Sequence, residues 1–264
     1  MEKAKTVFNK VLNRVPEITI YFWIIKILGT TIGETAADFL STNLHLGLVN
    51  TSYVMGGLLA IVLAIQFKLK RYVAANYWIA VILISVVGTL ITDQMVEGFG
   101  ISLVTTTIIF SVGLALVFII RYLKEKTLSI HSILTAKREA FYWLAILFTF
   151  ALGTAGGDLL SEGLGIGYVQ AGLIFAGAIA LIAVIYYFFR TKKFTLNAIF
   201  AFWSVYILTR PLGASLGDYL TQAPQDGGLG ISTAWITPIF LIGIISLVMY
   251  LSVKKVDVLT TVEK

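Results

Sequence analysis

The chain has no cysteine and only two histidines, His45 and His131. Disulfide bonds, thiolate metal sites and cysteine nucleophiles are therefore excluded, and neither histidine has a partner at the spacing of a metal site. Charged residues make up only 13% of the 264 residues, about half the share of a typical soluble domain. With 58% hydrophobic residues, this composition predicts a protein that is surrounded by lipid and gives no sign of a cofactor.

Eight apolar runs are long enough to cross a membrane, because a helix of about 20 residues spans the hydrocarbon core. Helices are expected because a lipid environment offers no water to the backbone groups of any other structure. We therefore expect an all-α polytopic membrane protein with one domain over residues 1–264. The expected spans are residues 18–40, 49–67, 76–95, 102–120, 140–160, 167–189, 198–220 and 232–253.

One pattern, Trp-x9-Gly-x4-Asp, occurs four times with constant internal spacing, and its copies start 55 to 65 residues apart. Such a period indicates structural repeats. The copies are Trp23–Gly33–Asp38, Trp78–Gly88–Asp93, Trp143–Gly153–Asp158 and Trp203–Gly213–Asp218. With two spans per copy, the sequence predicts eight transmembrane helices in four parallel-oriented helical-hairpin repeats, approximately residues 15–70, 71–125, 136–192 and 196–255.

The basic residues lie almost entirely on one side of the expected membrane. Of the 20 lysines and arginines, 18 precede the first span, follow the last, or lie in the loops between repeats. The loops inside the repeats contain Glu97, Glu162 and Asp226 and no basic residue. This pattern predicts that both termini are cytoplasmic, in a bacterial inner membrane. It also explains the net charge of +6, so we expect the lipid bilayer rather than nucleic acid as a partner, and a homo-oligomer is possible.

The tryptophans and glycines of the pattern are expected to have packing roles. A tryptophan at the start of a span is typical of an anchor at the cytoplasmic headgroups. Each glycine is followed four residues later by another small residue, and this spacing lets two helices approach closely. Those small residues are Ala37, Thr92, Gly157 and Gly217.

The four aspartates lie about 22 Å beyond the tryptophans, at the C-terminal ends of their helices. A carboxylate is unfavourable there because it meets the negative end of the helix dipole. Three interpretations remain open: the aspartates end the helices in water, they contact a neighbouring repeat, or they form a central site for a cation or proton. Eleven residues after each tryptophan, on the same helix face as the aspartate, the sequence has Glu34, Thr89, Thr154 and Ala214.

If the aspartates form a site, Asp38, Asp93, Asp158 and Asp218 would be its ligands and Glu34 a fifth acid. Oxygen ligands alone would suit Mg²⁺, Ca²⁺ or Mn²⁺. Polar side chains in the second span of each repeat could complete the site, although they could equally form hydrogen bonds between helices. These are Thr51, Ser52, Thr105, Thr106, Thr107, Gln170, Thr233 and Thr237.

Only two basic residues, Lys26 and Arg210, lie inside the expected spans. Lys26 is too far along the helix from Glu34 for a direct pair, about 12 Å, and it either extends to the cytoplasmic interface or serves as an internal counter-charge. Arg210 lies deeper and is expected to pair with an acid of another repeat. A broken helix at residues 210–213, caused by Pro211, would free carbonyl groups for an ion or for Arg210 itself.

The four copies of Trp-x9-Gly-x4-Asp, with segments such as FYWLAILFTFALGTAGGDLL and YFWIIKILGTTIGETAADFL, resemble a bacterial family of four-repeat inner-membrane proteins of unknown function. The resemblance covers about residues 15–253. It implies an integral membrane protein, and it assigns no activity to any residue.

Acids repeated inside the membrane, without an enzyme motif, favour a transporter or exporter of a small cation, most simply a divalent metal, with possible coupling to protons. A structural or partner-binding subunit is the main alternative, in which the charged residues only hold the repeats together. An intramembrane enzyme is disfavoured because HExxH, Gly-x-Ser-x-Gly and a Cys/His pair are all missing. A carrier of organic cations, with Trp235, Tyr53 and Tyr168 as cation–π partners, is a further variant.

Overall fold

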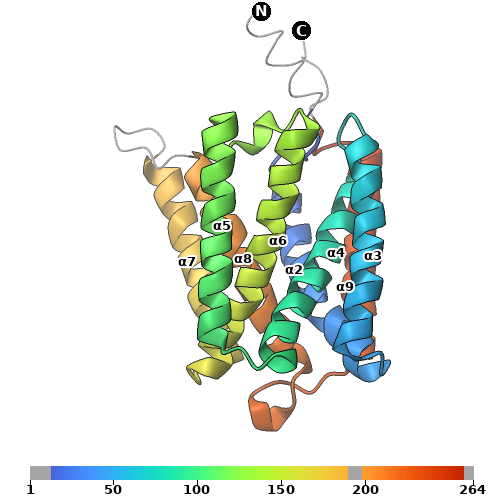
Figure 1. Ribbon diagram of the computed structural model, residues 1–264, viewed down its shortest axis with the longest axis vertical. Helices are drawn as coiled ribbons and strands as arrows, with labels where there is room; N and C mark the ends of the chain where they lie inside the picture. The colour runs from blue at the N-terminus through green and yellow to red at the C-terminus, as the bar shows by residue number, and fades with distance from the viewer. Residues whose placement is uncertain (1–12, 190–197, 259–264) are drawn as a thin grey trace, which may run out of the picture.

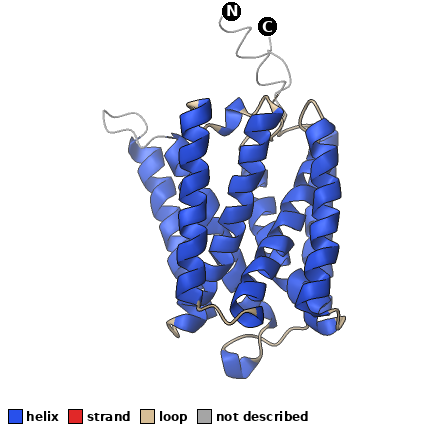
Figure 2. Cartoon of the chain, in the orientation of Figure 1, coloured by secondary structure: helices blue, strands red, loops and turns tan. Residues whose placement is uncertain are grey.

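The computed structural model describes residues 13–189 and 198–258, and the described chain is helical without strands (Figure 2). Its eight long helices lie side by side in one bundle (Figure 1). They are α2 (Ile20–Asp38), α3 (Gly47–Lys68), α4 (Ala74–Asp93), α5 (Leu103–Glu125), α6 (Ala136–Asp158), α7 (Tyr168–Phe189), α8 (Ala198–Thr221) and α9 (Thr233–Lys254). The predicted all-α class and the eight predicted helices are confirmed.

Seven of the described helices are long and apolar enough to cross a membrane. These helices indicate a multi-pass membrane protein. The exception is α2, which carries Lys26, Glu34 and Asp38 within 19 residues. Because α2 packs among the other first helices of the repeats, Lys26 and Glu34 are enclosed by protein, whereas Asp38 is partly exposed.

The first helices of the four repeats form a closed inner ring. In this ring α2 packs against α4, α4 against α6, α6 against α8, and α8 against α2. All four start at the end of the bundle where the tryptophans lie, here called the Trp end. They finish at the opposite Asp end, at the bottom of Figure 1. The repeated aspartates are therefore brought to the same end of one ring.

The outer helices do not form closely packed hairpins with the inner helices of their own repeats. Instead, α3 packs against α4, α5 against α6, and α7 against α8, and α9 closes the arrangement by packing against α2. The predicted four repeats are thus interlocked, because each outer helix covers the inner helix of the next repeat. Each repeat is a pair of consecutive helices in the chain, and the outer helix of each pair packs against the inner helix of the next repeat.

The repeated glycines make the close approach between neighbouring inner helices possible. A Cβ atom built on any of them would lie within 2.8 Å of the residue seven positions after the tryptophan of the next repeat. The pairs are Gly33 with Ser85, Gly88 with Phe150, Gly153 with Arg210, and Gly213 with Thr30. The last pair joins the fourth repeat to the first, so the same contact occurs at all four interfaces of the ring.

The inner helices differ in how they end. The first three aspartates are each followed directly by one wide π-helical turn, Phe39–Asn43, Gln94–Gly98 or Leu159–Gly163. Such turns are rare and are frequent at functional sites. The fourth inner helix continues through Asp218 to Thr221. It also continues through Pro211, so the expected break at residues 210–213 does not occur.

Candidate functional site

An aromatic layer occupies the Trp end of the inner ring. Trp78, Trp143 and Trp203 are buried between helices, and only Trp23 is partly exposed. The Trp203 indole donates a hydrogen bond to the Leu128 carbonyl at 2.9 Å. The expected position at lipid headgroups is therefore wrong for three of the four tryptophans, because neighbouring repeats enclose their rings.

Arg210 lies at the centre of the ring and joins all four inner helices. Its guanidinium donates to the Glu34 carboxylate at 2.9 Å and to the Thr154 hydroxyl at 2.7 Å. It also donates to the Thr89 hydroxyl and, at 3.2 Å, to the Thr30 carbonyl. The acid comes from another repeat, as the depth of Arg210 suggested. The positions eleven residues after the tryptophans thus supply most of its partners.

Lys26 is fully buried one layer closer to the Trp end. Its amine has no hydrogen-bond partner among the described residues. It lies 4.2 Å from the ring centroids of both Phe150 in α6 and Tyr206 in α8. Two aromatic faces therefore hold this amine inside the ring, and it does not extend to the membrane interface.

The four aspartates lie at the Asp end, and their charges interact with Glu34 and, in nearly every pair, with each other. Asp218 is buried, whereas the other three are partly exposed. Within residues 13–189 and 198–258, no group donates a hydrogen bond to these carboxylates and no basic residue pairs with them. Their negative charge is left for water, a proton or a bound cation.

The aspartates do not form a ready-made metal centre. No three histidine or carboxylate side chains in the described chain are close enough together to hold one metal ion. A polar cavity of about 440 Å³ does open between the first two repeats, and both Asp38 and Asp93 line it. Glu97 and His45 line the same cavity. A cavity of this volume has room for a hydrated ion.

The hydroxyl groups of the outer helices do not complete the aspartate set. Thr51, Ser52 and Thr107 donate to carbonyl groups of their own helices. Thr233 donates to the Asn43 side chain, and Thr237 donates to the Thr35 hydroxyl, both in the first repeat. The bonds of Thr233 and Thr237 are therefore hydrogen bonds to another helical segment, which was the alternative interpretation of these side chains.

The remaining candidates lie on the outer helices and are not aimed at the ring. Tyr53 and Trp235 are 77% and 71% exposed, as expected for side chains that face lipid. Tyr168 donates to Glu162 at 2.9 Å, and Gln170 is exposed. An organic-cation site built on these aromatics therefore has no geometric support.

Polar residues missed by sequence reasoning lie at the Trp end. Glu139 is buried, accepts from Gln66 at 2.8 Å and pairs with Arg14 at 2.5 Å. The hydroxyls of Tyr77 and Tyr142 lie 2.5 Å apart. The sequence does contain a pattern that points to these tyrosines, because the residue before each repeated tryptophan is aromatic.

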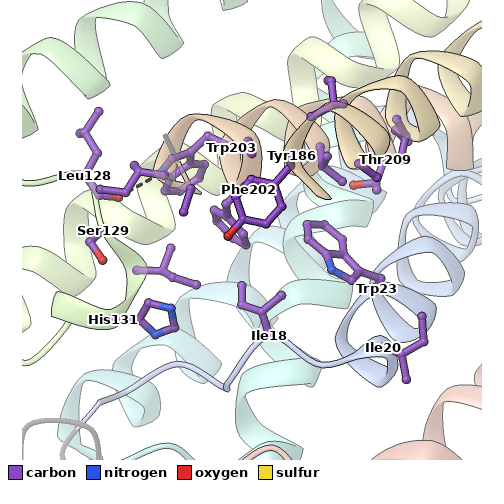
Figure 3. A pocket seen from close by; sticks show the side chains of 18 of the residues that line it. Ile18, Ile20, Trp23, Leu128, Ser129, His131, Tyr186, Phe202, Trp203 and Thr209 are labelled. Atoms are coloured by element: carbon purple, nitrogen blue, oxygen red, sulfur yellow. Dashed lines mark hydrogen bonds between the residues drawn. The ribbon is translucent and has the colours of Figure 1, made fainter. Parts of the chain in front are cut away.

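A second cavity, of about 460 Å³, lies at the Trp end between α2, α7 and α8 (Figure 3). Its walls are mostly apolar, with Trp23, Phe202 and Tyr186 among them. Ser129 and His131 of the loop between α5 and α6 supply polar atoms at one side. It is separate from the aspartates, which lie at the other end of the ring.

The repeat pattern and the ring agree with the comparison to known families. A family model described as a repeat of unknown function, DUF347, matches four times, at residues 21–72, 76–127, 141–192 and 201–256. No curated protein and no solved structure matches the chain. Since the four matches cover most of its length, the chain belongs to the DUF347 repeat family.

Proposed function

We propose that this protein transports a small cation across a membrane, and that Asp38, Asp93, Asp158 and Asp218 attract and bind the cation at the Asp end. The observation that carries the proposal is the gathering of four carboxylates, one from each repeat, without a described partner. Clustered acids at a helix end repel one another and the helix dipole, so a cation or proton must balance them.

The buried cations supply the second element of the proposed mechanism. Arg210 is bound to Glu34 in the middle of the ring, so it blocks the axis with a fixed positive charge. A cation at the Asp end meets this charge and passes only when the contacts of Arg210 rearrange. Arg210 and Lys26 thus act as internal counter-charges to the acids.

A divalent metal is the first cation to test. The purified protein, placed in liposomes, is given Mn²⁺ or Mg²⁺ outside while a metal-sensitive dye reports uptake. We expect Asp93→Asn and Asp158→Asn each to reduce the uptake rate at least about tenfold. Asp226→Asn serves as the matched control, because Asp226 is exposed in the loop after α8. Wild-type uptake in both ring variants would end the proposal.

A structural role is the second candidate, and the contacts of Arg210 favour it. A guanidinium that bonds to all four inner helices can simply hold the repeats together. In that case Arg210→Met lowers the melting temperature, and the Asp93→Asn and Asp158→Asn proteins behave like the wild type in every flux assay.

The proposed orientation places the Trp end in the cytoplasm of a bacterial cell, with the protein in the inner membrane. It is supported by the excess of lysine and arginine in the loops at this end. Because the chain lacks cysteine, single cysteines report the topology directly. In intact spheroplasts, a membrane-impermeant maleimide should label Asp226→Cys and leave Lys124→Cys unlabelled; the reverse pattern would invert the proposed direction.

A further inference from the structure

Lys26 and Tyr206 place two unpaired polar groups in the same layer of the inner ring. Both residues are fully buried, and neither the Lys26 amine nor the Tyr206 hydroxyl has a hydrogen-bond partner among the described residues. The corresponding positions of the other two repeats are Val81 and Ile146. The layer is thus apolar except for one amine and one tyrosine, and the amine lies over the face of that tyrosine ring.

These two groups bridge two polar regions of the axis. Toward the Trp end, the Tyr206 hydroxyl interacts electrostatically with Tyr142, whose hydroxyl lies 2.5 Å from that of Tyr77. Toward the Asp end, Lys26 interacts with Arg210, which holds Glu34. A line of exchangeable groups therefore runs from the aromatic layer to the centre of the ring.

The energetics require a further partner for the amine. A buried ion costs several kcal/mol even after local relaxation, and a cation–π contact returns at most about 2 kcal/mol. Buried polar groups without protein partners are commonly bonded to ordered water. Water between Lys26, Tyr206 and the Arg210–Glu34 pair would satisfy these atoms and connect them into one chain.

Within this proposed transport function, we propose that Lys26 is a proton carrier, which passes protons between water beside the Arg210–Glu34 pair and the Tyr206–Tyr142–Tyr77 hydroxyls and so couples proton movement to cation transport. Arg210 cannot take this role because a guanidinium does not release its proton in a protein. The charged and titratable groups next to Lys26 are Arg210 and Tyr206, both from α8. Glu34, Tyr142 and Tyr77 are connected to Lys26 through these two residues.

Each step moves one proton and changes no other bond. The Lys26 ammonium first gives a proton to water or to the Tyr206 oxygen, and each hydroxyl in the chain accepts one proton as it releases another. The uncharged amine then takes a proton from water beside the Arg210–Glu34 pair, and that water is replenished with a proton from the Asp end. The ammonium is restored, the Arg210–Glu34 pair is unchanged, and one proton has moved along the axis.

Proton flux in liposomes tests the relay. A potassium gradient with valinomycin sets the membrane potential, and a trapped pH dye reports proton entry while the metal dye reports Mn²⁺ uptake in parallel. We expect Lys26→Arg to reduce proton flux at least about tenfold, because arginine keeps the charge and cannot release a proton. Lys124→Arg, at an exposed position of α5, is the matched control. Wild-type proton flux in Lys26→Arg would overturn the relay.

A second variant keeps the test decisive if Lys26→Arg fails to fold. Tyr206→Phe removes one hydroxyl of the relay and keeps the ring that lies against Lys26, so we expect the variant to fold and its proton flux to fall several-fold. Tyr122→Phe, on the exposed face of α5, is its control. Wild-type protein that takes up Mn²⁺ without proton movement would overturn the relay and leave cation transport standing, whereas absence of both fluxes would overturn both proposals.

Discussion

The acidic residues at the two ends of the inner ring differ in whether they have hydrogen-bond or ion-pair partners. At the Trp end, Glu139 is paired with Arg14, and Asp257 accepts a hydrogen bond of 2.6 Å from Tyr72. At the Asp end, four carboxylates have no such partner in the described chain. The comparison teaches that Glu139 and Asp257 at one end hold the bundle together, whereas the four repeated aspartates at the other end remain available to bind something else.

The largest loss of stability is expected when the Arg14–Glu139 pair at the Trp end is broken. Arg14→Met leaves Glu139 buried without its charge partner, and such a loss costs about 3–5 kcal/mol. We expect a strongly reduced free energy of unfolding in a denaturant titration of the detergent-solubilised protein. The double variant with Glu139→Gln should recover part of the loss. A single variant as stable as the wild type would remove the distinction between the two ends.

The second-largest loss of stability is expected at the contact between Gly153 of α6 and Arg210 of α8. A Cβ on Gly153 would lie 2.3 Å from the Arg210 side chain, whereas one on Gly156 of the same helix would meet nothing within 4 Å. We expect Gly153→Ala to lower the free energy of unfolding by about 1–3 kcal/mol through overpacking. Gly156→Ala should be neutral or slightly stabilising. Equal melting temperatures for the two variants would contradict the close packing of α6 and α8.

A smaller, pH-dependent effect is expected at Asp257, which lies outside the spanning helices. Burial raises the pKa of Asp257 above its usual 3.8, and the hydrogen bond from Tyr72 offsets part of this rise. The folded state therefore binds the proton more tightly, and the contribution to stability is lost as pH rises from 3.8 through the raised pKa. Asp257→Asn should remove this dependence from melting curves recorded across that range.

The smallest effects on stability are expected for the aspartates themselves. Since no described group pairs with Asp38 or Asp93, the substitutions Asp38→Asn and Asp93→Asn remove repulsion without breaking a contact. We expect changes within about 0.5 kcal/mol, with a slight gain favoured at low ionic strength. A loss of stability as large as that of Arg14→Met would reveal a structural role for these carboxylates. The acids at both ends of the ring would then stabilise the bundle.

The repeat spacing predicted much of this architecture. The constant interval between Trp, Gly and Asp predicted that the first helices of the four repeats are equivalent, and the two spans per repeat predicted that these helices share one direction. It did not predict that α3 covers α4 and that α9 covers α2. The spacing of a motif along the sequence indicates which residues belong to one repeat. It does not indicate whether the two helices of a repeat pack against each other or against a neighbouring repeat.

The residues of the site were predictable in different degrees. Arg210 was predicted to pair with an acid of another repeat because a deep arginine has few alternatives in lipid. Glu139 was missed because an acid beside basic residues at the start of a helix resembles a solvated charge. The burial of Trp143 was missed for a similar reason, since a tryptophan near a membrane boundary resembles a headgroup anchor until its neighbours are known.

The covering of α2 by α9 gives the bundle no natural first or last unit. The Glu17 amide donates to the Asp257 carbonyl at 3.0 Å, so the beginning of the first repeat and the end of the fourth meet at the Trp end. A circularly permuted chain, with its present ends joined by a linker and a new opening between α5 and α6, would therefore keep the contacts between the inner helices and between each inner helix and its outer helix. A fragment of the first two repeats, by contrast, would leave α2 without its covering helix α9 and the ring open.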